Sequence, residues 1–358
     1  MKILFYNYAM NMGGIERTIA TLSSEFAKEH EVVILQYTND EAFYPLDDAV
    51  RLEKFGFSPT GNVLVRTLRL YFSIRKFLKA EKPDVVFCMN KTHLPLFCIA
   101  TRQSESVVIG VERSNPNLKL TFRQKLQRRM SVMADGFVFQ TERARSAYPL
   151  KTRKNSIVIP NSISNPDVFL PFDGEKKKAF VSVGRLEKVK GYDLLIQAFS
   201  LISDKVPEWT LTLFGHGDER EALQKQAESF HIADKVEFAG EDLHAFLKAR
   251  ECEVFVLSSR SEGMPNSLLE AMAAGLACVA FDCQNGPREL ITHGENGLLV
   301  SAENVDELAA GMLLLAQNDE MRQKLATQAQ NIRFGHSPEQ TALSWSRYAN
   351  ECLIKKRG

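Results

Sequence analysis

Short apolar runs alternate with amphipathic stretches along most of the chain. The first half contains five runs rich in β-branched and aromatic residues, at 2–8, 31–37, 84–89, 106–112 and 136–140. Between them lie stretches with the hydrophobic spacing of a helix, such as 18–28 and 63–82. Strands that alternate with helices form a parallel sheet with helices packed on its faces. The pattern therefore predicts an α/β fold.

The same pattern starts again in the second half of the chain. Its apolar runs lie at 179–184, 210–214, 235–239, 253–257 and 278–281, and a helical stretch follows each of them. The proline-containing segment 161–178 is expected to connect two domains. The tail 338–353 is amphipathic and needs another surface to pack against. Two α/β domains usually meet at a cleft, and ligands of open α/β sheets bind outside the carboxyl ends of the strands.

Length and composition agree with two ordinary soluble domains. The chain has 358 residues, 44% of them hydrophobic and 25% charged, and a typical domain has about 150 residues. No apolar run approaches the roughly 18 residues of a membrane span. The chain begins with strand-like residues, so we expect no signal peptide. The six cysteines form no C-x-x-C pair and mostly lie in apolar runs, which favours buried free thiols in a reducing compartment and no zinc site.

The net charge of +1 conceals a difference between the two halves. Residues 1–166 contain 24 Lys and Arg against 15 Asp and Glu, a balance of +9. The remaining residues contain 21 against 29, a balance of −8. A basic half indicates an anionic partner, which is a membrane surface, a phosphate or a nucleic acid, unless the difference is chance surface composition.

The predicted helix at 63–82 carries much of this positive charge. Arg66, Arg69 and Lys76 fall on one helical stripe, and apolar residues cover much of the remainder. Basic amphipathic helices are typical of membrane surfaces, and the same arginines are suited to contact a lipid diphosphate. An ordinary surface helix that buries its apolar face in the core has the same pattern.

One stretch of the second half combines two carboxylates with the start of a helix. After the apolar run 252–257 the chain passes through a loop that contains Glu262, and the predicted helix at 268–274 carries Glu270. Pro265 suits the first turn of a helix, where its missing N–H costs nothing. The N–H groups of such a turn bind anions. Two carboxylates beside an anion site indicate a phosphorylated ligand that contains a sugar.

Glycine-containing loops follow other strands. Arg185 and Lys190 bracket the loop 184–191, in which an arginine offers a bidentate fork to a phosphate and a lysine a mobile charge. Met12-Gly13-Gly14 and Gly215-His216-Gly217 also follow strands, and glycine lets a backbone come close to a ligand. The first of these does not match the G-x-G-x-x-G fingerprint. A solvated basic loop and tight turns without a ligand are the alternatives.

A carboxylate and a guanidinium stand side by side at the end of a strand in the first half, in the sequence Glu112-Arg113-Ser114-Asn115-Pro116. Such a pair can bind sugar hydroxyls or a phosphate. A salt-bridged loop end explains it equally well.

Taken together, these motifs resemble those of the GT-B-fold glycosyltransferases of family 4, over nearly the whole chain. The resemblance rests on Gly13-Gly14 with Glu16-Arg17, on Gly184-Arg185 with Lys190-Gly191, and on Glu262-x7-Glu270 before Ala271. Gly215-x-Gly217 and the segment 296–300 support it. The motifs 12–17 and 112–116 are most similar to those of bacterial enzymes that build surface polysaccharides or lipid-linked oligosaccharides.

The resemblance implies two Rossmann-like parallel-sheet domains that face a deep cleft. Residues 1–165 are the expected acceptor-binding domain, on which a C-terminal helix at 338–358 packs back, and residues 166–337 are the expected nucleotide-sugar-binding domain. It also implies a retaining transfer of a hexose or N-acetylhexosamine from a UDP-sugar. Neither a metal nor another cofactor is expected, because the UDP-sugar is a co-substrate.

The family's site residues carry over by position. Arg185 and Lys190 would neutralise the leaving diphosphate in place of a metal, and Glu262 would hold hydroxyls of the donor sugar; these three are the expected catalytic residues. Glu270 would hold the ribose hydroxyls. The remaining donor contacts are expected from backbone groups at Gly13, Gly14, Gly184, Gly215, Gly263, Met264, Pro265, Asn266 and Ser267.

The acceptor side departs from the family in one respect. Many relatives have a histidine near the donor sugar where this chain has Glu112 and Arg113. We assign contacts with the acceptor or the sugar to these two residues and to Arg66 and Arg69. The resemblance implies a saccharide acceptor that is lipid-linked. The expected location is the cytoplasm, at the anionic surface of the inner membrane.

Two other functions are compatible with the same observations. A UDP-sugar epimerase has the same fold but needs acid and base residues that the motifs do not provide. A non-enzymatic polyanion-binding protein would use the basic first half, and the acidic second half argues against it. Nucleic acid is not an expected partner.

Overall fold

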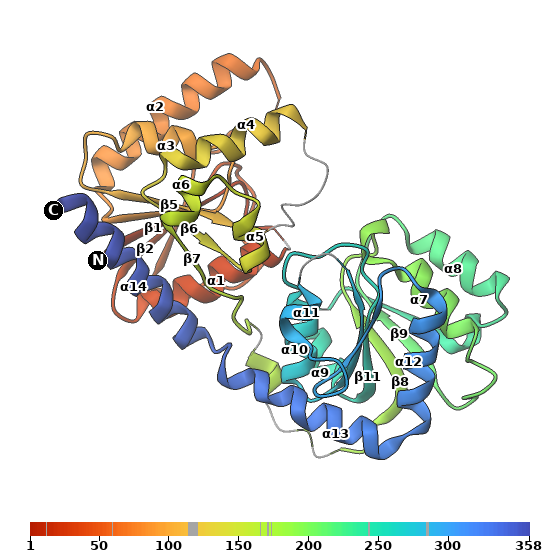
Figure 1. The fold of residues 1–358 in the computed structure, drawn as a ribbon. Coiled ribbons are helices and arrows are strands. Elements are labelled where there is room, and N and C mark those ends of the chain that lie inside the picture. Colours follow the sequence, from red (N-terminus) through yellow and green to blue (C-terminus); the bar gives the residue numbers. More distant parts are fainter. Residues whose placement is uncertain are drawn as a thin grey trace. The chain divides into compact units, whose positions relative to one another are not determined.

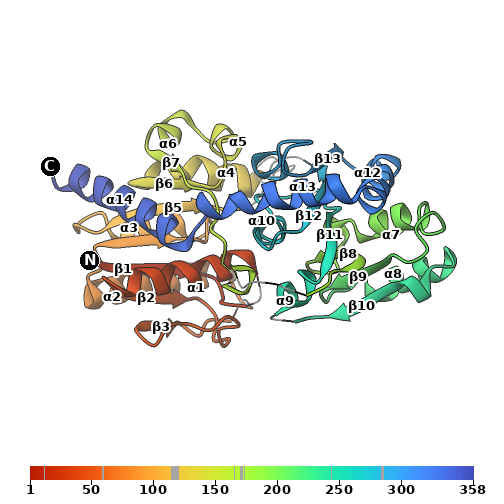
Figure 2. The ribbon, with the colours of Figure 1, turned by 90° about the horizontal axis from the view of Figure 1, so that it is seen from below.

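The computed structural model describes residues 1–358 except 12, 59, 114–120, 165, 170, 171, 173, 243, 284 and 285. The chain divides into two compact units, residues 1–164 with 337–358 and residues 165–336. Figure 1 and Figure 2 show that each unit is a sheet with helices on its faces. The predicted α/β class is therefore confirmed. Of the motifs above, Met12 and residues 114–116 lie outside the described part of the chain.

All strands of the first unit run parallel, in the order β3-β2-β1-β4-β5-β6-β7. Their bounds are β1 Lys2–Asn7, β2 Glu31–Gln36, β3 Val50–Lys54, β4 Val85–Cys88, β5 Val107–Glu112, β6 Gly136–Phe139 and β7 Ser156–Val158. The chain moves outward from β1 through β2 and β3 and then returns to place β4 on the other side of β1. This reversal of strand order is the Rossmann-like arrangement.

Helices cover both faces of this sheet, because successive side chains of a strand point to opposite sides. They are α1 Gly14–Ala27, α2 Val63–Glu81, α3 Leu94–Ala100, α4 Phe122–Met130, α5 Glu142–Ser146, α6 Leu150–Lys154 and α14 Pro338–Arg357. Phe5 of β1 packs with Ile19 of α1 and Trp345 of α14 on one face. Its neighbour Tyr6 packs with Ile74 of α2 on the other face.

The C-terminal helix α14 belongs to the first unit, although the chain reaches it last. Trp345 is fully buried and meets Phe87 of β4 edge-on, with ring centroids 4.9 Å apart. Tyr348 Oη accepts a hydrogen bond from the N–H of Phe137 (3.0 Å) and donates one to the carbonyl of Asn155 (2.8 Å). The amphipathic tail is therefore a helix that completes the core of the first unit, as predicted.

The second unit repeats the strand order of the first as β10-β9-β8-β11-β12-β13, again all parallel. The strands are β8 Lys177–Val183, β9 Thr210–Phe214, β10 Val236–Gly240, β11 Cys252–Leu257, β12 Ala277–Asp282 and β13 Leu298–Ser301. The helices are α7 Tyr192–Ser200, α8 Arg220–Ser229, α9 Ala245–Ala249, α10 Asn266–Ala273, α11 Pro287–Leu290, α12 Val305–Gln317 and α13 Asp319–Ala329.

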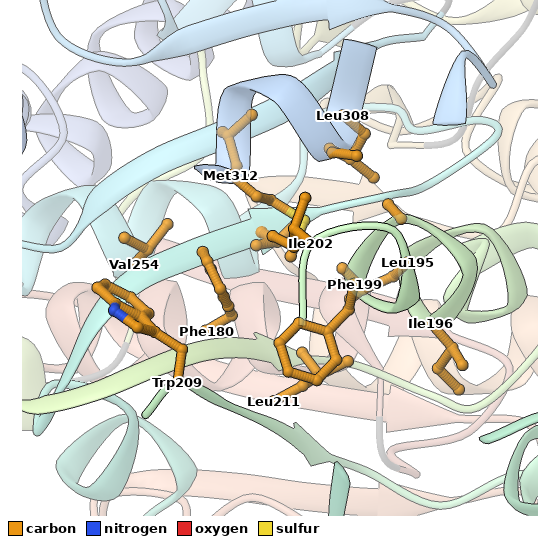
Figure 3. Packing of buried hydrophobic residues seen from close by; sticks show 14 of the residues in the cluster. Phe180, Leu195, Ile196, Phe199, Ile202, Trp209, Leu211, Val254, Leu308 and Met312 are labelled. Atoms are coloured by element: carbon orange, nitrogen blue, oxygen red, sulfur yellow. The ribbon is translucent and has the colours of Figure 1, made fainter. Parts of the chain in front are cut away.

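Aromatic rings fill the centre of the second unit's core. Figure 3 shows Phe180 of β8 between Trp209 and the helices α7 and α12. The Phe180 ring centroid lies 4.7 Å from that of Trp209 and 5.9 Å from that of Phe199. Met312 of α12 closes the cluster and is fully buried. This packing fixes β8, from whose carboxyl end the first loop of the candidate site departs.

The hydrophobic pattern does not predict three strands that the structure contains, β3, β7 and β13. All three lie at the edges of their sheets and are only partly buried. An edge strand has a neighbouring strand on one side only, and these three strands are less buried than the central ones, so their apolar pattern is weaker.

Two helices begin earlier than predicted. Helix α1 starts at Gly14 instead of Thr18, and α10 starts at Asn266 instead of Leu268. Pro265 lies at the N-cap of α10 with extended backbone angles (φ −74°, ψ 105°), so the expectation that it belongs to the first turn was wrong. A proline fits this position because it needs no N–H there and its fixed φ is compatible with the extended conformation.

The six cysteines are all free thiols, as predicted, and all but Cys98 are buried. Within the described residues, no helix is long and apolar enough to cross a membrane.

Candidate active site

The second unit brings two loops together where its strand order reverses. β8 and β11 are neighbours in the sheet, with Phe180 opposite Val254, although the chain visits β9 and β10 between them. The loops that follow β8 and β11 therefore leave the carboxyl edge side by side. In open α/β sheets this position is the usual ligand site. Both predicted catalytic motifs lie on these two loops.

A short ion pair joins the two loops. Lys190 Nζ lies 2.7 Å from Glu262 Oε1, and Ser259 Oγ donates a hydrogen bond to the same oxygen at 2.7 Å. The side chains of Lys190 and Glu262 are 22% and 10% exposed. Charged groups interact more strongly in such a half-enclosed place than in open water. Two residues that the sequence singled out separately are thus in direct contact.

Backbone contacts hold the same two loops in register. Gly191 has a left-handed φ of +67°, and a Cβ built on it would lie 2.0 Å from the carbonyl oxygen of Ser258. Ser258 Oγ donates a hydrogen bond to the carbonyl of Lys190 (3.1 Å), and the N–H of Arg260 donates one to Val189 (2.8 Å). Glycine is required at 191 both for its conformation and for the close approach of the β11 loop.

A clamp between Arg260 and Asp193 reinforces this junction. Arg260 Nη1 and Nη2 donate to the two carboxylate oxygens of Asp193 at 2.8 and 2.7 Å, the bidentate geometry that arginine favours. Lys188 Nζ also lies 2.8 Å from Asp193. Burial acts to raise the pKa of Asp193, but the hydrogen bonds from Arg260 and Lys188 prevail and lower it to about 2. The carboxylate is therefore charged at any physiological pH.

Arg185 lies on the same loop in a more open position. Its side chain is 54% exposed, and Nη1 lies 2.5 Å from Glu187 Oε1. Gly215 comes so close to this loop that a Cβ on it would lie 1.9 Å from the carbonyl oxygen of Gly184. A larger residue at 215 would push the two loops apart. The structure thus gives Gly215 a packing reason, and the contact of Gly184 and Gly215 with a donor stays a prediction.

The β11 loop continues into α10, whose N-terminal end carries the partial positive charge of a helix dipole. Gly263, Met264, Pro265, Asn266 and Ser267 form this approach. Gly286 packs against it, since a Cβ there would lie 2.7 Å from Pro265 Cδ. Glu270 lies on the second turn of α10 and is 1% exposed. Its predicted role in binding a ribose is not tested by these contacts.

In the first unit, Gly13 is enclosed by a neighbouring carboxylate. Glu16 folds back so that its Oε1 accepts a hydrogen bond from Asn7 Nδ2 at 3.0 Å. A Cβ on Gly13 would lie 2.2 Å from Glu16 Oε2, so a side chain at 13 would displace this contact. Gly14 is the first residue of α1. The contact of both glycines with a donor diphosphate stays a prediction.

Glu112 lies at the end of β5 and is 1% exposed. Lys91 Nζ is 2.8 Å from each of its carboxylate oxygens, and Tyr148 Oη donates to Oε2 at 2.5 Å. Burial is the largest cause, and Glu112 a further one, of a pKa of Tyr148 raised far above its usual value. This buried carboxylate orients Lys91, whose side chain is 38% exposed. Sequence reasoning did not single out Lys91, although it lies three residues after the end of β4.

Arg113 points into the first unit. Its guanidinium lies over the ring of Trp345, 5.3 Å from the centroid, and Nη1 donates to Asn161 Oδ1. Burial lowers the pKa of Arg113 to about 10, so the group stays charged at neutral pH. These contacts tie the end of β5 to α14 and to the segment that leads out of the unit. The predicted contact of Arg113 with an acceptor is not tested by them.

Arg66 and Arg69 lie on the first half of α2, as predicted. Arg69 lies over the ring of Phe57, 4.9 Å from its centroid. Both arginines act to lower the pKa of Tyr37, against the larger effect of burial, which raises it. They therefore lie close to the carboxyl edge of β2, which Tyr37 follows directly.

Two family profiles match the chain, one for each half. The family described as Glycosyltransferase Family 4 matches residues 12–164, and the family described as Glycosyl transferases group 1 matches residues 171–332. Together they span nearly all of both units.

Individual proteins resemble the chain over almost its full length. An uncharacterized glycosyltransferase of Haemophilus influenzae is 27% identical over 94% of this chain and 97% of its own. A Campylobacter jejuni enzyme is 25% identical over 92% of each chain; its name describes an α-1,4-N-acetyl-D-galactosaminyltransferase that acts on a GalNAc-containing saccharide of diphospho-undecaprenol. The crystal structure of Anabaena HepE in complex with UDP and glucose has a TM-score of 0.84 at 18% identity, over 97% of this chain and 98% of its own.

The Arg260–Asp193 clamp should make the free energy of unfolding fall as the pH is lowered. The pKa of Asp193 is lower in the folded chain than in the unfolded chain. The ion pair therefore stabilises the fold fully above pH 4, and this stabilisation is lost as the pH falls towards 2. We expect Asp193→Asn to lower the free energy of unfolding at pH 7 by about 1 kcal/mol, a figure that allows for partial screening by solvent. Urea unfolding at pH 7, 5 and 3 measures the difference.

The matched control is Asp204→Asn, which changes an exposed aspartate of the same unit. It is expected to unfold like the wild type at each pH. A difference between wild type and Asp193→Asn that is the same at pH 7 and pH 3 would contradict the assigned role of the clamp.

Proposed function

The chain belongs to glycosyltransferase family 4 and has the GT-B fold, and from this premise we propose that it transfers a hexose or N-acetylhexosamine from a UDP-sugar to a saccharide acceptor, with retention of the anomeric configuration and without a metal. The observation that carries the proposal is the contact between Lys190 and Glu262 across the loops after β8 and β11. It brings a cation and a carboxylate together at the strand-order reversal, which supports the proposal.

The cations suit a leaving diphosphate. When the bond between a sugar and a nucleoside diphosphate breaks, negative charge develops on the diphosphate oxygens. Lys190 and Arg185 lie on the loop after β8, and the N-terminal end of α10 follows the loop after β11. Positive groups held in place before the reaction stabilise such charge effectively, because they need no reorganisation. In the proposed reaction they supply what a metal ion supplies in other transferases.

The carboxylate of Glu262 suits the sugar. Its Oε1 accepts the hydrogen bonds from both Lys190 and Ser259, which fixes the orientation of the group. We assign Oε2 to hydroxyl groups of the donor sugar. An ionised carboxylate only accepts hydrogen bonds, so it selects hydroxyls that donate. Retention would follow if the acceptor hydroxyl attacks from the side that the diphosphate leaves, with no covalent bond to the protein.

A lipid-linked acceptor and a membrane surface complete the proposal. The Campylobacter relative is named for a diphospho-undecaprenol saccharide, and the same class of acceptor is proposed here. Its lipid part would stay in the bilayer while the sugar reaches the site, with Arg66 and Arg69 beside the diphosphate. The protein would then act at the cytoplasmic face of the membrane, bound to its surface.

Helix α2 has the composition for this contact. Leu70, Ile74 and Leu78 face the core. On the outer side, large apolar side chains are 50–68% exposed: Val63, Leu64, Val65, Leu68 and Phe72. Exposed basic residues lie between and beside them: Arg69, Arg75, Lys76 and Lys79. Apolar side chains that face outward beside basic ones fit the boundary between lipid headgroups and acyl chains.

The catalytic assignment predicts the effect of one lysine. Lys190→Ala should lower kcat/KM for transfer by about 10²–10³-fold, since it removes a cation from the developing charge of the diphosphate. The assay uses UDP-glucose, UDP-galactose and their N-acetylated forms, in EDTA, with extracted lipid-linked saccharides as acceptors. It follows both the release of UDP and the anomeric configuration of the product by NMR.

Lys188→Ala is the matched control, because Lys188 lies two residues away in the same loop but pairs with Asp193 and is 64% exposed. It should retain activity within about threefold. The assignment fails if Lys190→Ala remains folded and equally retains activity, or if UDP-sugars are only isomerised in the absence of an acceptor.

The same proposal predicts that membrane binding depends on the basic residues of α2. Replacing Arg66, Arg69 and Lys76 by Glu should lower the partition coefficient on phosphatidylglycerol vesicles at least tenfold, because each basic residue near an anionic surface contributes about 1 kcal/mol. Vesicle sedimentation measures the bound fraction. Replacing Lys151, Arg153 and Lys154 of α6, which are exposed on another helix of the same unit, gives the same change in charge. Equal release of both triple variants from the vesicles would show that only the net charge of the protein matters. No release of the α2 variant would refute the proposal that α2 binds the membrane.

A further inference from the structure

Aromatic rings gather at the carboxyl edge of the first unit's sheet, and none of the predicted motifs includes them. Tyr8 directly follows β1, Tyr37 directly follows β2, and His93 follows β4 at the start of α3. β2, β1 and β4 are consecutive in the sheet. The cluster therefore lies where the strand order of the first unit reverses, which is the position that the Lys190–Glu262 pair has in the second unit.

Tyr8 forms the outer layer of this cluster. Its ring is stacked on that of Tyr37, with centroids 5.0 Å apart and planes 16° apart. Tyr8 is 37% exposed, whereas Tyr37 beneath it is 2% exposed. The buried ring of Tyr37 thus covers one face of the Tyr8 ring and keeps Tyr8 from packing more deeply. The rest of the Tyr8 ring stays exposed.

The layer below is held rigidly. Tyr6 Oη and His93 Nδ1 are 2.7 Å apart and share a hydrogen bond, and the His93 ring lies 5.4 Å from that of Tyr37. Tyr37 Oη donates to the carbonyl of Ser58 at 3.2 Å. The carbonyl of Tyr8 accepts hydrogen bonds from the N–H groups of Tyr37 and Thr38, both at 3.1 Å. The platform is therefore fixed before any ligand arrives.

The surroundings are polar but the platform itself is uncharged. Burial, with smaller effects of Arg66 and Arg123, lowers the pKa of His93 to about 4, so the imidazole is neutral at physiological pH. Burial raises the pKa values of Tyr6 and Tyr37, which keeps both phenols protonated. A flat, neutral aromatic surface with hydroxyl and guanidinium groups around it matches the two kinds of surface on a sugar. The C–H groups of a pyranose pack on the ring, and its hydroxyls reach the polar rim.

We propose that Tyr8, supported by Tyr37 and His93, is a stacking platform for a pyranose ring of the acceptor saccharide. The proposal rests on the proposed function for its ligand, since that function requires the first unit to hold a saccharide. Tyr8 acts by binding and orienting the sugar, not in the chemical step. Loss of its ring therefore weakens acceptor binding and leaves donor binding unchanged.

Binding of simple glycosides tests the platform apart from catalysis. Saturation-transfer NMR is recorded with the full chain in saturating UDP and the methyl α-glycosides of glucose, galactose and their N-acetylated forms. We expect transfer to the ring C–H protons of at least one glycoside, a loss of most of that signal in Tyr8→Ala, and its retention in Tyr8→Phe and Tyr8→Trp. Phe230→Ala removes an aromatic ring of similar exposure (38%) from the second unit and should leave the signal unchanged.

Kinetics provide the second readout. In the transfer assay Tyr8→Ala should raise the KM for the acceptor about tenfold, a change comparable with the loss of one stacked ring, without changing the KM for the UDP-sugar. The absence of glycoside signals in the wild type, an unchanged signal in Tyr8→Ala, or an equal rise in both KM values would overturn the platform. If no UDP-sugar is turned over but the glycoside signal depends on Tyr8, the proposed function fails and the platform stands.

Discussion

The contact between Lys190 and Glu262 is the constraint on which the second unit's site depends. The two residues are 72 positions apart, and they meet because β8 and β11 are neighbours at the reversal of strand order. Three further features keep them together: the left-handed Gly191 against Ser258, the bidentate Arg260–Asp193 pair, and the aromatic core that fixes β8. Each acts on the loops and not on the ion pair itself.

The two units carry different kinds of side chains at the same place in their topology. In both, the strand order reverses beside the first strand, and the loops at that point carry the candidate residues. In the second unit these are charged groups, which suit a diphosphate and sugar hydroxyls. In the first unit they are aromatic rings around Tyr8 with arginines nearby, which suit a sugar face and an anionic acceptor. The two sets of side chains thus suit the two different ligands of the proposed transfer.

The elements of the fold could be predicted from the sequence better than the contacts between them. The fold class, the long basic helix and the C-terminal helix follow from hydrophobic periodicity, which is a local property of the sequence. The three missed strands lie at sheet edges, where burial is incomplete and the pattern is weak. Arg185, Lys190 and Glu262 could be singled out as candidates because they lie in loops that follow strand ends. Ser259, which donates to Glu262, and the Arg260–Asp193 pair, which joins the same two loops, were not singled out. An ordinary Ser, Arg or Asp becomes part of a site only through the order of the strands.

Glu112 is a second case in which the local sequence could not decide the role of a residue. Its position beside Arg113 at a strand end left open whether it binds a ligand or forms a salt bridge. The structure buries it against Lys91 and Tyr148, two residues far from it in sequence. No local pattern could choose between the two interpretations, because the choice depends on what packs against β5.

The most direct test of the account is calorimetric titration of the metal-free protein, in EDTA, with UDP and with UMP. Arg185 and Lys190 are assigned to the diphosphate, and hydrogen bonds to charged groups each contribute about 1.5–3 kcal/mol. We therefore predict that UDP binds at one site per chain and about 10²-fold more tightly than UMP. Equal affinity for UDP and UMP, or UDP binding that appears only after Mg²⁺ is added, would contradict it.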